Sequence, residues 1–183
     1  MGTALFPKKF RSDFMGNSEN KEDLNHYLAA VFLKLHSDHP MHLVVTVDDS
    51  IITNEDTLLQ YGRIASSTSE EADTRLVRHA INCAACGYDQ IVIRTVDTDV
   101  IVLLLGNIHY IHDIHESDVF VLFGKGTAQK YYHITDIALE FGEHVCKALP
   151  FHYVFTGCDT ISSFFSFGKC KWFDAWMNSD EKD

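Results

Sequence analysis

The chain has 183 residues, of which 46% are hydrophobic and 22% are charged, and its formal net charge is −11. These values are typical of one globular domain, or most of one, that buries a core without disulfides or a structural metal. The acidic balance counts against nucleic-acid binding unless metal ions or a local basic patch reverse the electrostatic field.

The first part of the chain predicts a helix followed by two strands. Apolar residues recur at helical spacing over residues 20–36, where Asn20 is the expected N-cap. The stretches "HLVVTV" and "SIITN" then predict two strands, and the adjacent acids Asp48 and Asp49 between them predict a hairpin turn. We therefore expect an N-terminal helical segment at 1–40 and a core domain that begins at residue 41.

Helices and strands alternate along the rest of the chain. Residues 70–87 predict a helix closed by Gly87, and Pro150 is expected to end another helix over 135–149. The aliphatic run at 99–106 fits either a strand or a short helix leading into one. Further strands are expected at 89–95, 118–126 and 152–156. Continuous aliphatic strands between helices predict an α/β fold over 41–156, with a parallel sheet covered on both faces.

The composition also bears on location. The five cysteines have no regular spacing, which favours reduced thiols over a disulfide framework. The N-terminus has no long apolar stretch, and the longest aliphatic run is far short of a membrane span. We expect an intracellular protein, nuclear or cytoplasmic, without a membrane partner.

Acidic residues gather at the ends of the expected elements. They are Glu71 and Asp73 near the start of the helix at 70–86, Asp97 and Asp99 after the strand at 91–95, and Asp159 after the strand at 152–156. Ligands of open parallel sheets bind beyond the carboxyl ends of the strands. Clustered carboxylates repel one another unless a cation neutralises them, and Mg²⁺ or Mn²⁺ accepts such oxygen ligands. Taken singly, each acid also has a simpler explanation. The helix dipole alone favours Glu71 and Asp73. Asp97 and Asp99 fit a plain turn, and Asp159 fits an N-cap.

The motifs "EEADT", "VDTDVIVLLLG" and "TGCDTISSFFSFGKCKWFDAW" together resemble the carboxylate series of flap-endonuclease-type (PIN-like, XPG-like) 5′ nucleases. The same set also resembles uncharacterised animal proteins of this type, including ones derived from mobile elements. The resemblance implies a three-layer PIN-like α/β fold with a mainly parallel central sheet, followed by a short helix–turn–helix. It implies five metal ligands, Glu71, Asp73, Asp97, Asp99 and Asp159. Among these, Asp97, Asp99 and Asp159 are the expected catalytic residues.

The last segment, 157–183, holds the Gly-Cys-Asp turn and a truncated helix–turn–helix. Ser166, Phe167 and Gly168 occupy the place of the glycine-rich loop that grips the DNA backbone in this family, and Lys169 and Lys171 follow. The resemblance therefore implies that Gly168, Lys169 and Lys171 bind nucleic acid, with DNA favoured over RNA.

The chain also departs from the family pattern. Two further aspartates are expected on earlier strands, but Asp48 and Asp49 are the only candidates upstream and are better explained as a turn. We therefore expect a Mg²⁺- or Mn²⁺-dependent phosphodiester hydrolase that is partial or degenerate. A non-catalytic PIN-like module that binds nucleic acid or protein is the alternative. A HAD-type phosphatase with Asp97 as nucleophile ranks third, because the later lysine it requires is not identifiable.

Three other patterns rank lower. His109, His112 and His115 have ligand-like spacing, but a solvated loop or edge segment is the favoured interpretation. Cys83 and Cys86 form a C-x-x-C motif at a helix end, where core packing is favoured over redox chemistry. "GKG" at 124–126 lacks the spacing of a phosphate-binding loop and predicts a turn.

Overall fold

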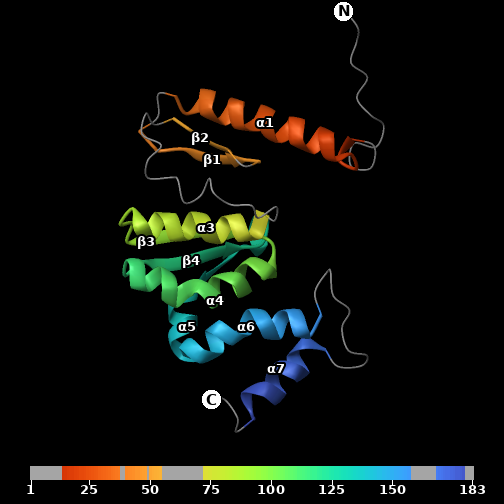
Figure 1. The fold of residues 1–183 in the computed structure, drawn as a ribbon, viewed down its shortest axis with the longest axis vertical. Coiled ribbons are helices and arrows are strands. Elements are labelled where there is room, and N and C mark those ends of the chain that lie inside the picture. The colour runs from red at the N-terminus through yellow and green to blue at the C-terminus, as the bar shows by residue number, and fades with distance from the viewer. Residues whose placement is uncertain (1–13, 38–39, 49, 55–71, 158–167, 180–183) are drawn as a thin grey trace, which may run out of the picture. The chain divides into compact units, whose positions relative to one another are not determined.

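The computed structural model describes residues 14–37, 40–48, 50–54, 72–157 and 168–179. The chain forms two compact units, residues 1–70 and 71–183. The described residues of each unit combine α-helix with a small sheet, so the fold is mixed α/β (Figure 1). Among the described residues, no helix has both the length and the apolar character needed to cross a membrane.

Among its described residues, the first unit contains one helix and one hairpin. Helix α1 spans Ser18–Leu35, and its N-cap is Asn17 rather than the predicted Asn20, because the Asn17 side chain accepts a hydrogen bond of 2.9 Å from the Glu19 N–H. Strands β1 (Val44–Val47) and β2 (Ser50–Thr53) pair antiparallel. Asp48 has a left-handed φ of 51°, so the predicted turn is confirmed.

The second unit is built on a three-stranded sheet in the order β3-β4-β5. Strand β3 (Gln90–Thr95) runs parallel to β4 (Asp118–Phe123), and β4 pairs antiparallel with β5 (Lys130–His133). The "GKG" turn leads from β4 into a short 3₁₀ helix, η3 (Gly126–Ala128), before β5. The polar edge strand β5 was not predicted, and it gives the described sheet one parallel and one antiparallel pairing.

Among the described residues, helices pack on one face of this sheet, and the predicted coverage of both faces stays a prediction. Ile91, Ile93, Val119 and Val121 are buried on that face, and Val92 on the opposite face is 58% exposed. The helices that share the core with this face are α3 (Ala72–Ala85), α4 (Thr98–Ile114) and α5 (Ile134–Phe141). Figure 1 shows α3 and α4 running alongside the strands.

Helix α4 is the centre of the second unit. Its buried residues are Val100, Leu104, Leu105, Ile108 and Ile111, which share one core with β3, β4, α3 and α6. Helix α6 (Glu143–Phe155) packs on its outer side. A helix with neighbours on several sides is apolar almost all round, so its sequence resembles a buried strand. The run at 99–106 is therefore part of a long helix. His109 and His112 lie on that helix rather than in a loop, and His115 is its C-cap.

The predicted boundary at Pro150 and the predicted strand at 152–156 are both wrong. The break comes earlier, at Gly142, whose φ of 78° ends α5, and α6 then continues through Pro150 to Phe155. Pro150 packs against Gly106 of α4, where a Cβ would lie 2.5 Å from the proline Cγ. This close contact between α4 and α6 offsets the backbone hydrogen bond that proline cannot donate. Helix α7 (Lys169–Met177) completes the unit.

Candidate metal centre

Asp97 and Asp99 are positioned by the junction between β3 and α4. Asp97 is the N-cap of α4, and its Oδ1 accepts a hydrogen bond of 3.0 Å from the Asp99 N–H. The Asp97 N–H donates to Thr95 Oγ1 at 3.0 Å, which links the cap to the end of β3. An aspartate at this position satisfies a backbone donor that the first helical turn leaves open. Local sequence is therefore enough to explain both the turn and the orientation of Asp97.

Asp73 reaches the same place from a different element. It lies in the first turn of α3, which packs beside α4 (Figure 1). One carboxylate oxygen from each of Asp73, Asp97 and Asp99 lies within 4.8 Å of the others. Asp97 is exposed, whereas Asp73 and Asp99 are half-buried. The helix dipole favours each acid separately, but it does not require acids from two helices to converge.

Two further side chains connect this acidic cluster to α6 and α7. The Tyr153 hydroxyl of α6 donates a hydrogen bond of 2.5 Å to Asp99 Oδ1. Lys169 Nζ of α7 lies 3.0 Å from the centroid of the Tyr153 ring. Sequence reasoning missed Tyr153 because it placed residues 152–156 on a strand, and the residue carries no motif that would single it out.

The donor set fits a hard divalent cation. The hydrogen bonds to Asp97 and Asp99 each occupy one carboxylate oxygen, and within the described part of the chain the second oxygen of each makes no further hydrogen bond. Three carboxylates that offer oxygen atoms at short mutual distance suit Mg²⁺ or Mn²⁺, which prefer such ligands. The Tyr153 hydroxyl has the position of an outer partner that orients a ligating carboxylate.

The remaining predicted residues are distributed as follows. Glu71 and Asp159 lie outside the described residues. Gly168 is the N-cap of α7, where an added Cβ would meet no atom within 4 Å. Lys169 is half-buried beside Tyr153, and Lys171 is exposed. The structure thus brings together three of the five predicted acids and sets one of the two predicted lysines beside their tyrosine partner.

The first unit carries a second group of ligand-type side chains that sequence reasoning missed. Glu22 and His26, four residues apart on α1, approach Asp48 in the hairpin turn, with ligand atoms within 4.8 Å of one another. His26 Nε2 lies 2.7 Å from Asp48 Oδ2. All three residues are exposed. The only sequence signal is the i, i+4 spacing of Glu22 and His26, which places them on one helix face.

The lower-ranked motifs do not form sites among the described residues. His115 pairs with Asp89 at 3.0 Å, and His109, His112 and His115 form no shared group of ligand atoms. Burial raises the pKa of the Cys83 thiol, with the neighbouring Cys86 adding to the effect. A raised pKa keeps a thiol protonated and unreactive, which agrees with a packing role. Gly124 and Gly126 both have positive φ, as expected of a turn.

Comparison with known proteins identifies no relative: no family model, curated protein or solved structure matches the chain.

Proposed function

We propose that the chain is a divalent-metal-dependent nuclease domain of the PIN-like, flap-endonuclease type, with a partial set of metal ligands. The observation that carries this proposal is the convergence of Asp73, Asp97 and Asp99 within 4.8 Å. The order of the sequence motifs supports the same class, including its three-layer fold and its helix–turn–helix. The described sheet, with one antiparallel pairing, is smaller than the one this class implies.

The residues have distinct roles in the proposed chemistry. Asp73, Asp97 and Asp99 would hold Mg²⁺ or Mn²⁺. When bound, the cation offsets the charge of a phosphodiester and lowers the pKa of nearby water. Tyr153 holds the Asp99 carboxylate in one orientation through its hydroxyl, which leaves the other oxygen for the cation.

Two lysines provide local positive charge on a chain whose net charge of −11 would otherwise repel nucleic acid. Lys169 lies one residue beyond the N-cap of α7 and packs on Tyr153, so its ammonium group is close to the acidic cluster. Lys171 follows on the same helix and is exposed. A local cationic strip of this kind contacts phosphates even on an acidic protein. We therefore propose that the Lys169 and Lys171 ammonium groups position the phosphate backbone of the substrate.

Metal binding and cleavage test the proposed centre. Mn²⁺ affinity is measured by calorimetry on the 183-residue chain, alongside cleavage of labelled single-stranded and flap oligonucleotides. We expect weak binding and slow or absent cleavage, because the three described acids are only part of the implied carboxylate set. Asp99→Ala should remove the binding and any cleavage, whereas Asp113→Asn, at an exposed acid near the other end of α4, should change neither.

Tyr153→Phe supplies a second, finer test. Removal of the hydroxyl should weaken Mn²⁺ binding roughly tenfold, the lower limit for loss of a partner that orients a ligand. Tyr110→Phe, at an exposed tyrosine of α4, is the matched control. Mn²⁺ binding that survives both Asp99→Ala and Tyr153→Phe unchanged would contradict a site at this cluster.

The lysines are tested by salt dependence. Replacing Lys169 and Lys171 together with alanine should weaken oligonucleotide binding and reduce the slope of log K against log[salt] by roughly one to two units. Lys125→Ala combined with Lys130→Ala removes the same charge from the β4–β5 connection and β5, so it is the control. Equal slopes for the two double variants would show that the α7 lysines make no special phosphate contact.

A further inference from the structure

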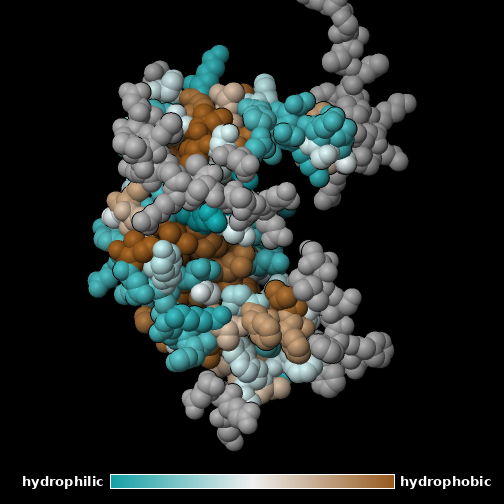
Figure 2. Space-filling view, viewed as in Figure 1, coloured by the Kyte–Doolittle hydropathy of each residue, from teal (hydrophilic) through white to brown (hydrophobic). Residues whose placement is uncertain are grey.

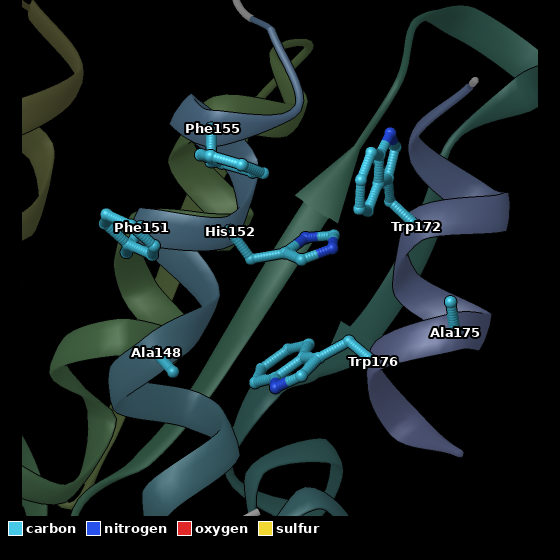
Figure 3. A pocket seen from close by; sticks show the side chains of 7 residues that line it. All are labelled: Ala148, Phe151, His152, Phe155, Trp172, Ala175 and Trp176. Carbon is cyan, nitrogen blue, oxygen red and sulfur yellow. The ribbon is translucent and has the colours of Figure 1, made fainter. Parts of the chain in front are cut away.

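An aromatic cleft of about 380 Å³ lies between α6 and α7. Its aromatic lining comes from both helices: Phe151, His152, Phe155, Trp172 and Trp176. Figure 3 shows the His152 ring reaching from α6 toward α7, with the two tryptophan side chains on either side of it. The volume is within the range of small-molecule sites. Neither the sequence motifs nor the acidic cluster accounts for this cleft.

The α6 side of the cleft offers exposed ring faces. Phe151 and Phe155, one helical turn apart, have ring centroids 5.9 Å apart and planes inclined by only 21°. Phe151 is 73% exposed and Phe155 is 44% exposed. Trp172 meets Phe155 edge-on at 5.9 Å from the opposite helix. The result is an open aromatic platform with an indole wall, which suits a flat ring better than a bulky aliphatic group.

The cleft also contains an unsatisfied polar atom. The His152 ring stacks on Trp176 with centroids 5.1 Å apart, and its Nε2 is buried and makes no hydrogen bond within the described residues. A buried ring nitrogen without a partner is costly. An apolar ligand would leave Nε2 without a hydrogen bond. A heterocycle whose edge carries both donors and acceptors would satisfy Nε2 in either of its tautomers.

A cationic side chain, Lys169, lies beside the cleft. Lys169 lines an adjoining hollow of about 310 Å³ together with His152, Tyr153 and Asp174. The same turn of α6 therefore presents His152 to the aromatic cleft and Tyr153 to Asp99 of the acidic cluster. A nucleic-acid strand with one base in the cleft would carry its phosphates past Lys169 toward that cluster.

We infer that the cleft between α6 and α7 stacks an unpaired nucleobase of a single-stranded segment, with His152 hydrogen-bonded to the base edge. This inference rests on the proposed function, because it specifies the substrate as a strand with an unpaired base. Aromatic platforms beside cationic side chains bind single strands in this manner. The occupant combines a flat ring, an edge with polar atoms and a phosphate, and each matches a feature of the cleft.

The two tryptophans of the chain provide the measurement. The sequence contains only Trp172 and Trp176, and both line the cleft, so intrinsic fluorescence reports on this place. The full chain, without divalent metal, is titrated with a short single-stranded oligodeoxyadenylate and with an abasic strand of equal phosphate count. We expect saturable quenching by the oligodeoxyadenylate and little change with the abasic strand. Equal quenching by the two strands would overturn the inference.

A pair of variants tests the platform itself. Phe151→Ala should weaken oligodeoxyadenylate binding by roughly 5- to 150-fold, as expected for the loss of one stacking partner. Tyr110→Ala, at a tyrosine of α4 that is 53% exposed, should leave the affinity unchanged. Unchanged thermal unfolding verifies that Phe151→Ala is folded. Equal affinities of Phe151→Ala and the original chain would overturn the inference, as would a tryptophan shift that depends on protein concentration alone and marks the cleft as a contact between copies.

These experiments test base binding in the cleft separately from the proposed nuclease activity. Because the titration contains no metal, base-dependent quenching without any Mn²⁺-dependent cleavage would support the cleft and count against the proposed catalysis. Cleavage that is unaffected by Phe151→Ala, together with quenching that does not depend on bases, would overturn the cleft and leave the proposed catalysis standing.

Discussion

The two units each bring three ligand-type side chains together, but they hold them differently. Asp73, Asp97 and Asp99 occupy the first turns and the cap of two helices that pack on one core. In the first unit, the described hydrophobic residues that are buried are Ala29 and Val47, while the three clustered side chains are all exposed. In the second unit the position of the acids follows from core packing, whereas in the first it depends on contacts among exposed side chains.

This difference has a physical consequence for function. A ligand set is useful when its geometry exists before the ligand arrives, because ordering side chains at that moment costs conformational entropy. The helix ends of the second unit meet that condition, since Val100 and Val77 are buried one turn or less from the acids. An exposed pair such as His26 and Asp48 is free to separate, so its approach in the structure carries little binding energy.

The largest effect should come from the core beneath the acidic cluster. Leu104→Ala removes a completely buried side chain at the centre of α4 and should lower the free energy of unfolding of this unit by about 2–5 kcal/mol. Leu35→Ala, at a residue of α1 that is 71% exposed, should change stability by less than about 0.5 kcal/mol. Native-state hydrogen exchange of the α4 and α1 amides measures each effect separately. Similar losses for the two variants would remove the contrast between the units.

The next effect concerns the crossing of α4 and α6. Gly106→Ala would put a Cβ 2.5 Å from Pro150 Cγ, and the resulting shift of α6 should cost about 1–3 kcal/mol. Because α6 carries Tyr153, the same variant should also weaken Mn²⁺ binding. Gly168→Ala, where the space is open, is the control and should cost less than Gly106→Ala in denaturant unfolding, because it loses only the N-cap preference for glycine over alanine. A stabilised Gly106→Ala, as ordinary helix propensity would give, would contradict this packing.

Two substitutions of Asp97 distinguish its role as a helix cap from its proposed role as a metal ligand. Asp97→Ala removes the acceptor for the Asp99 N–H and should destabilise α4 by about 0.5–2 kcal/mol. Asp97→Asn keeps the cap and removes a repulsive charge, so the metal-free protein should be as stable as the original or slightly more stable. Mg²⁺ should raise the thermal midpoint of the original chain more than that of either variant. Equal shifts in all three proteins would exclude Asp97 as a ligand.

The smallest effect is expected in the first unit. Asp48→Gly removes the contact with His26 but relieves the left-handed φ of 51°. Both side chains are about half-exposed, 52% for His26 and 50% for Asp48, so the net change should be within about 0.5 kcal/mol. Hydrogen exchange of the α1 amides is the measurement, and Asp48→Asn, which tolerates the same φ, is the control. A loss well above that figure in Asp48→Gly alone would show that the pair fastens the hairpin to α1.

Local patterns were sufficient for several parts of the molecule. Helical spacing predicted α1, Gly87 marks the end of α3, and the paired acids at Asp48 predicted the hairpin turn. The aspartates after β3 were singled out because they follow a predicted strand, at the edge where open parallel sheets bind ligands. The structure adds that Asp97 caps the following helix, which depends on only a few neighbouring residues. Such features need no knowledge of distant contacts, so the one-dimensional pattern contains them.

Other parts depended on contacts between segments distant in sequence. The aliphatic run of α4 reads equally well as a strand, and its helical state follows from neighbours on several sides. Pro150 is tolerated inside α6 because Gly106 lets the two helices approach. The partnership of Tyr153 with Asp99 spans 54 residues and depends on that same approach. Amino-acid order specified the local caps and turns through short-range sterics and hydrogen bonds, whereas packing of α4 against α3 and α6 assembled the acidic cluster, its tyrosine partner and the aromatic cleft.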